Sequence, residues 1–162
     1  MRIIFLDIDG VLNTDRAVRL RQLHEQADIN FDAEAMKNLQ ELIDATDAYV
    51  VISSTWRIHY NTENRLWTEL IRNFMQYGLE HRIIGITPVL DSNLQPSTRW
   101  REIESWLRNY LDGHIQSFVI VDDEWEMGPY TRTHFLKCQG YRGITTEVKD
   151  KAIQILGTVR DK

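Results

Sequence analysis

The chain has 162 residues, 43% hydrophobic and 27% charged, a composition typical of one globular domain with a real core and not of a disordered segment. The formal net charge of −5 argues against general coating of nucleic acid, although it leaves room for a local basic rim. A lone cysteine, Cys138, excludes an intramolecular disulfide, and no signal peptide or membrane-spanning run is evident, so we expect a cytoplasmic protein with no membrane partner.

The first predicted element is a strand at residues 3–6, which ends on two acids and a glycine. Asp7 and Asp9 lie two positions apart, so in an extended chain their carboxylates point to the same side and repel each other. A divalent cation between them would relieve that repulsion, and Gly10 would supply a tight turn or a close backbone approach. The alternative is a pair of aspartates that only caps a turn.

The next stretch, residues 14–31, is polar and carries three arginines. Asp32 can then cap a helix with one apolar face, and the apolar run at residues 48–53 predicts a second buried strand. A further amphipathic helix is expected to begin at Thr62 and to end near Gly78.

A shorter strand at residues 82–87 precedes a helix that we expect to open at Pro96 and Ser97 and to close at Gly113. The remaining predicted elements are a strand at 117–123 that again ends on paired acids, a weaker strand at 133–139 and a helix from about 147 to 156.

Strands and helices therefore alternate along the chain, which is typical of an α/β fold. We expect a three-layer, Rossmann-like open sheet of about five mainly parallel strands with helices on both faces. Residues 1–162 would form a single domain, and the short 14–31 segment leaves no room for a substantial cap domain.

Polar side chains follow three of these strands at the point where each strand ends. Asp7 and Asp9 follow the first, Ser53 and Ser54 the second, and Asp122 and Asp123 the strand at 117–123. Because the carboxyl ends of parallel strands meet at one edge of a sheet, these groups are expected to converge there.

The same segments resemble a known family in order and spacing. "FLDIDGV", "VVISS", a basic residue at a later helix start and "FVIVDDE" are similar to the four motifs of haloacid dehalogenase-like (HAD) phosphohydrolases. A closer likeness, in "SSTWR" (53–57), "RWREIESWL" (99–107) and "FVIVDDEWEM" (118–127), is to the small capless HAD domains of polynucleotide-repair proteins. The resemblance spans residues 3–126.

This resemblance implies a Mg²⁺-dependent phosphatase that works through an aspartyl phosphate. Asp7 would attack phosphorus, and Asp9 would protonate the leaving alcohol and later deprotonate water. Asp7, the backbone carbonyl of Asp9 and an acid of the 122–123 pair would hold the metal. We expect Asp123 to bind it directly and Asp122 to lie behind it.

Ser53 would donate a hydrogen bond to a phosphate oxygen, with Ser54 as the alternative if the strand register shifts by one. Arg99 matches the cation of the third motif, and Arg101 is the alternative. Trp100 departs from the family pattern, because it stands where the motif has glycine.

Trp56 and Arg57 follow the second motif, where an aromatic ring could stack on a base and a guanidinium could clamp a phosphate. Packing of both residues beneath the sheet edge is the alternative. Arg16, Arg19 and Arg21 could line the entrance for a polyanion, although such a run is more often a solvated face. The expected substrate is a nucleotide or a phosphorylated polynucleotide end.

Two other functions remain open on the sequence. One is a catalytically idle HAD-like module that binds a metal or a partner. The other is a phosphoacceptor receiver domain, which is disfavoured because no aspartate ends the strand predicted at 82–87.

Overall fold

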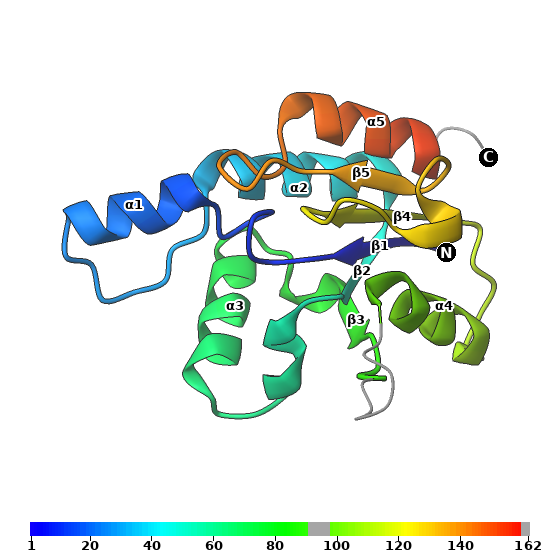
Figure 1. The fold of residues 1–162 in the computed structure, drawn as a ribbon, viewed down its shortest axis with the longest axis horizontal. Coiled ribbons are helices and arrows are strands. Elements are labelled where there is room, and N and C mark those ends of the chain that lie inside the picture. Colours follow the sequence, from blue (N-terminus) through cyan, green and yellow to red (C-terminus); the bar gives the residue numbers. More distant parts are fainter. Residues whose placement is uncertain (91–97, 160–162) are drawn as a thin grey trace.

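The computed structural model describes residues 1–90 and 98–159, and its centre is a five-stranded, all-parallel sheet (Figure 1). The strand order is β3-β2-β1-β4-β5. The strands are β1 (Arg2–Leu6), β2 (Tyr49–Ile52), β3 (Ile83–Ile86), β4 (Ser117–Asp122) and β5 (Phe135–Lys137). The predicted α/β architecture is confirmed, and every strand pair is parallel.

Helices cover both faces of this sheet. The α-helices are α1 (Asp15–Leu23), α2 (Ala33–Thr46), α3 (Arg65–Gln76), α4 (Arg99–Asn109) and α5 (Thr146–Leu156). Three short 3₁₀ helices, η1 (Thr55–His59), η2 (Glu80–Arg82) and η3 (Gly128–Tyr130), lie in the connections.

The core has two parts because successive strand residues point to opposite faces. Ile4 and Leu6 of β1 join the cluster formed with α2, α3 and α5. Ile3 and Phe5 join the cluster on the other face, which is closed by α4. A strand covered on both faces needs a continuous apolar run, which explains the unbroken run at residues 3–6.

The first differences from the predicted elements lie in the polar stretch at 14–31. It contains α1, which was not predicted because the helix buries one residue, Ala17, and therefore has no apolar periodicity. Asp32 caps α2 as expected, and it also joins α1 to α2 by accepting from Thr14 and Arg16. Within the described residues, this segment holds no cap domain.

Other boundaries differ by a few residues. The third helix begins at Arg65 with Asn64 as its cap, because η1 and its turn occupy the start that was assigned to Thr62. α4 ends at Asn109 and not at Gly113, and its predicted opening residues, Pro96 and Ser97, lie outside the described residues.

β1 and β4 lie side by side although more than a hundred residues separate them (Figure 1). Between these two strands the chain changes the side of β1 on which it adds strands. β2 and β3 extend the sheet on one side of β1, whereas β4 and β5 extend it on the other. Ligands of open α/β sheets bind beyond the carboxyl ends of the strands at such a reversal. The topology therefore predicts a ligand site at residues 7–10 and 122–126, which lie just after β1 and at the end of β4.

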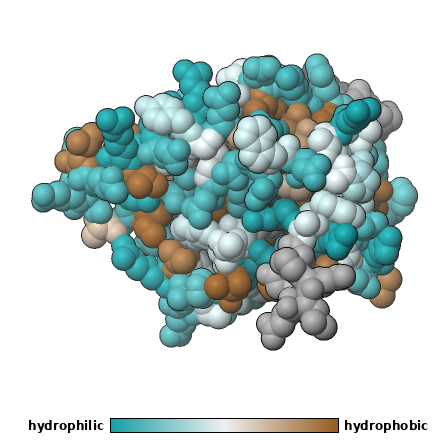
Figure 2. Space-filling view, in the orientation of Figure 1, coloured by the Kyte–Doolittle hydropathy of each residue, from teal (hydrophilic) through white to brown (hydrophobic). Residues whose placement is uncertain are grey.

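The face of the molecule that Figure 2 shows is mainly hydrophilic, with separate hydrophobic side chains. Those at the left edge of the view lie over α1, where Leu20 and Leu23 are exposed. Among the described helices, none combines the length and the apolar character needed to cross a lipid bilayer.

Candidate active site

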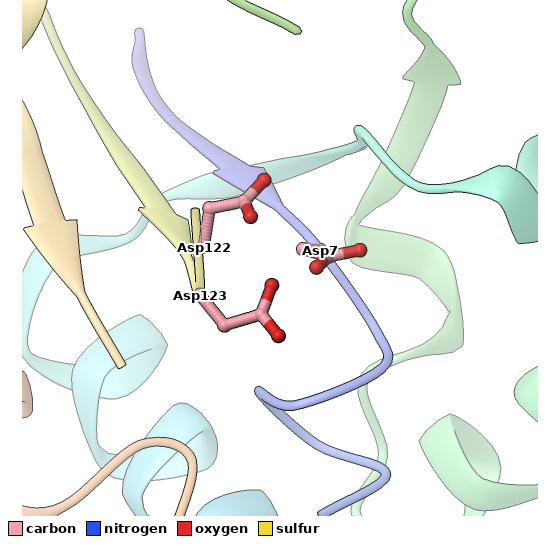
Figure 3. A group of neighbouring side chains, drawn as sticks. All are labelled: Asp7, Asp122 and Asp123. Carbon is pink, nitrogen blue, oxygen red and sulfur yellow. The ribbon is translucent and has the colours of Figure 1, made fainter. Parts of the chain in front are cut away.

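Three aspartates meet at the carboxyl ends of β1 and β4 (Figure 3). Asp7 follows β1, Asp122 is the last residue of β4 and Asp123 comes next. One carboxylate oxygen of each lies within 4.8 Å of those of the other two. Asp7 is 6% exposed and Asp122 1% exposed, whereas Asp123 is open to solvent.

The backbone brings these carboxylates together. β1 and β4 pair with Leu6 opposite Val121, and the Asp7 amide donates to the Val121 carbonyl at 3.1 Å. Gly10 has φ +78°, and a Cβ at this position would overlap the Asp123 carboxylate. Both the expected turn and the expected close approach are therefore present at this glycine.

Arg99, the first residue of α4, supplies positive charge to the cluster. Its Nη1 lies 3.0 Å from Asp122 Oδ2 and 3.3 Å from Asp7 Oδ1, and it also donates to the Ser53 carbonyl. Arg101 is exposed and stacks over the Trp100 ring instead. Of the two predicted cations, the structure brings Arg99 to the site.

Trp100 does not displace this arginine. Its ring packs against Gly128, which has φ +53° and has no space for a Cβ beside the indole. Because the bulk of Trp100 is accommodated there, α4 still begins at Arg99.

The charges in this cluster are not balanced within the chain. Burial, reinforced by the Asp122 carboxylate, raises the pKa of Asp7 to about 8, although Arg99 acts in the opposite direction. Burial likewise raises the pKa of Asp122 to about 6 against the effect of Arg99. Among the described residues Arg99 is ion paired with two of the three acids, so ionisation of all three leaves a net charge of −2 on this group of four side chains.

The donor atoms suit a hard divalent cation. Each of the three aspartates offers a carboxylate oxygen, which is the ligand type that Mg²⁺ prefers. Two uncompensated negative charges match the charge of such an ion. Asp122 is already engaged by Arg99 and by the Glu124 amide, whereas Asp123 is the exposed member of the group.

Ser53 lies directly beside Asp7, because its amide donates to the Leu6 carbonyl at 2.8 Å. Its buried Oγ has no hydrogen-bond partner among the described residues. A buried hydroxyl is normally hydrogen bonded, so this one is available to an incoming ligand. The Ser54 hydroxyl, in contrast, accepts from the Trp56 amide and caps η1.

Asp9 lies apart from the three converging carboxylates. β1 ends at Leu6, so the alternation of an extended chain no longer applies, and the expected cation between the Asp7 and Asp9 side chains is not supported. The Asp9 carboxylate is exposed and accepts from Trp56 Nε1 at 3.1 Å and from Asn13 Nδ2 at 2.9 Å.

Trp56 and Arg57 are both buried. The Trp56 indole packs against Phe31, with ring centroids 5.6 Å apart, so the packing alternative describes it better than base stacking does. Arg57 donates to the Ser54 carbonyl at 2.6 Å and forms an ion pair of 2.8 Å with Glu102 of α4. It thereby joins the segment after β2 to the helix that carries Arg99.

The three arginines of the 14–31 segment do not form a common rim. Arg16 is ion paired with Asp32 and Glu34, and Arg21 donates to Asn13 and to the Asn30 carbonyl. Arg19 is exposed. Two of the three guanidinium groups thus hold α1 in place.

Residues 3–148 match the family described as the HAD domain in Swiss Army Knife RNA repair proteins. The chain belongs to this HAD family. The match confirms the predicted likeness to capless HAD domains of polynucleotide-repair proteins, and it extends into α5. No similar protein was found among curated proteins or among solved structures.

Two residues outside the predicted set, Glu102 and Asn13, hold predicted site residues in position. Glu102 holds Arg57, and Asn13 holds Asp9. The spacing of Arg99 and Glu102, three residues apart on a predicted helix, was an available signal that both side chains lie on one face. Nothing in the sequence position of Asn13 indicates that its side chain donates to Asp9.

The raised pKa of Asp7 predicts how stability depends on pH without metal. The folded domain retains a proton between about pH 4 and pH 8 that the unfolded chain releases, so the free energy of unfolding falls as pH rises through this range. Asp7→Asn removes this effect and should make the metal-free domain more stable than wild type at pH 8, with a difference that shrinks as pH falls toward 4. Urea denaturation in a chelator measures the difference.

Asp9→Asn is the matched control, because that carboxylate lies outside the cluster, and its stability should stay within about 0.5 kcal/mol of wild type. If the free energy of unfolding changed with pH in the same way in wild type and in Asp7→Asn, the Asp7 carboxyl would not be the cause of the pH dependence.

The buried ion pair gives a second prediction. Arg57→Ala removes the guanidinium of the buried Arg57–Glu102 ion pair and should lower the free energy of unfolding by about 3 kcal/mol, as measured by chemical denaturation. Adding Glu102→Gln to Arg57→Ala should recover part of this loss, because the buried negative charge is then gone. If the double variant lost as much free energy of unfolding as Arg57→Ala alone, the buried charge of Glu102 would not be the cause of the loss.

Proposed function

We propose that this HAD domain is a Mg²⁺-dependent phosphatase that hydrolyses a phosphomonoester through an aspartyl phosphate on Asp7. The observation that carries the proposal is the surroundings of Asp7. Its carboxylate contacts Arg99 and belongs to an oxygen-only set of acids. On the adjacent strand end, Ser53 has a buried hydroxyl with no hydrogen-bond partner among the described residues. A transferred phosphoryl group needs this combination of nucleophile, cation and hydrogen-bond donor.

Asp7 and Asp123, with Asp122 behind them, would hold the metal together with the backbone carbonyl of Asp9. Bound Mg²⁺ would neutralise phosphoryl oxygens and favour the ionised form of Asp7. Arg99 also favours the ionised form of Asp7, because its guanidinium contacts the carboxylates of Asp7 and Asp122.

In the first step an Asp7 oxygen forms a bond to phosphorus while the ester bond breaks, and Asp9 gives its proton to the leaving oxygen. In the second step Asp9 takes a proton from water and the water oxygen attacks phosphorus. The bond between the Asp7 oxygen and phosphorus then breaks, which releases inorganic phosphate and restores the Asp7 carboxylate. The exposed position of Asp9, held by Trp56 and Asn13, suits a group that must meet both an alcohol and water. Ser53 would donate to one phosphoryl oxygen throughout.

The substrate we propose is a nucleotide or a phosphorylated polynucleotide end. Support comes from the RNA-repair context in the description of the family. The absence of a cap domain in the described residues also fits, because it leaves the mouth of the site accessible to a large substrate.

The deciding experiment is release of inorganic phosphate from p-nitrophenyl phosphate and mononucleotides, with and without Mg²⁺. We expect turnover that a chelator abolishes and that Asp7→Asn lowers by at least about 1,000-fold, because the nucleophile is lost. Equal turnover in the variant would refute the assignment of Asp7. Absence of turnover in the folded, Mg²⁺-saturated wild type would favour the catalytically idle module.

Arg99 and Arg101 form a matched pair for the second test. Arg99→Ala removes a half-buried cation from the reacting group and should lower kcat/KM by about 100-fold or more. Arg101→Ala changes an exposed side chain of the same helix and should stay within about twofold of wild type. The reverse order of effects, measured in the same phosphate-release assay, would show that the third-motif cation is Arg101.

A further inference from the structure

A hollow of about 400 Å³ opens beside the acidic cluster. Arg99 forms part of its wall and also contacts Asp7 and Asp122. The segment after β4, with Glu124, Trp125 and Glu126, forms another part. A substrate whose phosphate lies at Asp7 therefore has space for its leaving group next to Trp125. The volume falls within the range of small-molecule pockets.

Trp125 is 85% exposed, although large aromatic side chains usually bury most of their surface. The Lys137 ammonium lies 3.5 Å from the centre of its ring. β5 holds Lys137 in register with Asp122, so the lysine is placed by the sheet itself. Lys137 does not line the hollow, and the Trp125 side chain stays largely exposed although the ammonium lies over its ring, so aromatic surface remains open to a ligand.

The charges of the wall discriminate between possible occupants. The arginines of the wall are already ion paired, Arg57 with Glu102 and Arg99 with the aspartates of the cluster. Glu124 and Glu126 are exposed, and neither forms an ion pair within residues 1–90 and 98–159. Two carboxylates beside an open aromatic surface repel a further phosphate, whereas they can accept hydrogen bonds from the amino group of a neutral base. An uncharged aromatic heterocycle fits this wall better than a polyphosphate or a sugar phosphate.

We propose that Trp125 is a stacking platform for the nucleobase of the nucleotide that carries the scissile phosphate. For the reaction this rests on the proposed phosphatase function, and it adds the residue that would select an ester whose alcohol is a nucleoside. For binding it rests on the hollow, the indole and the wall charges alone. Stacking of a base on an aromatic side chain contributes enough affinity to set such a preference.

The first test is selectivity. The ratio of kcat/KM for adenosine 5′-monophosphate to kcat/KM for glycerol phosphate should fall by about 10-fold in Trp125→Ala, because glycerol has no ring to stack. Trp125→Phe retains an aromatic surface and should keep the ratio within about threefold of wild type. Leu111→Ala is the control, since this exposed residue follows the far end of α4 and does not line the hollow. An unchanged ratio in Trp125→Ala would overturn the proposal.

The second test does not depend on catalysis. Adenosine, which has no phosphate, should shift the indole N–H resonance of Trp125 in the Mg²⁺-loaded wild-type protein, with the resonance assigned by its loss in Trp125→Ala. If this shift occurs while no phosphate ester is hydrolysed, the platform stands and the phosphatase function fails. If glycerol phosphate is hydrolysed but adenosine causes no shift at millimolar concentration, the platform is wrong and the phosphatase function stands.

Discussion

The repulsion among Asp7, Asp122 and Asp123 is the constraint around which the rest of the site is built. Two of these carboxylates are buried at the ends of adjacent strands, where water cannot solvate their charges, and burial raises the pKa of both. A single guanidinium, Arg99, offsets part of that charge. The remaining imbalance disfavours the fully ionised cluster, and a divalent ion held by these carboxylates would relieve it.

Much of the surrounding structure serves to hold these charges in position. Arg99 reaches the acids only because α4 begins beside the ends of β2 and β4. The buried pair of Arg57 and Glu102 joins that helix to the segment after β2. Gly10, in turn, lets the backbone after β1 approach Asp123 without a side chain in between. Asp7, its neighbouring cation and the acid pair are therefore placed by three different connections of one sheet.

Most of the fold could be predicted from periodicity. Parallel strands buried on both faces need continuous apolar runs, so residues 3–6 and 117–123 were recognisable as strands. α1 was missed because it packs through Ala17 and through the bonds of Arg16 to Asp32, which leave no apolar stripe. The convergence of Asp7, Asp122 and Asp123 was predictable because it depends on the ends of adjacent strands. The position of a side chain beyond the strand, such as that of Asp9, was not predictable.

The sequence by itself determined which strands end in acids and hydroxyls, because an unbroken apolar run followed by polar residues can form little else in an α/β fold. Only the tertiary structure decided that Arg99 and not Arg101 meets those acids, and that Arg57 is paired with Glu102. It also decided that Trp56 is buried whereas Trp125 is exposed. The reason is that burial and ion pairing depend on the packing of α4 and η1 against the sheet, and contacts between segments so far apart leave no local pattern in the chain.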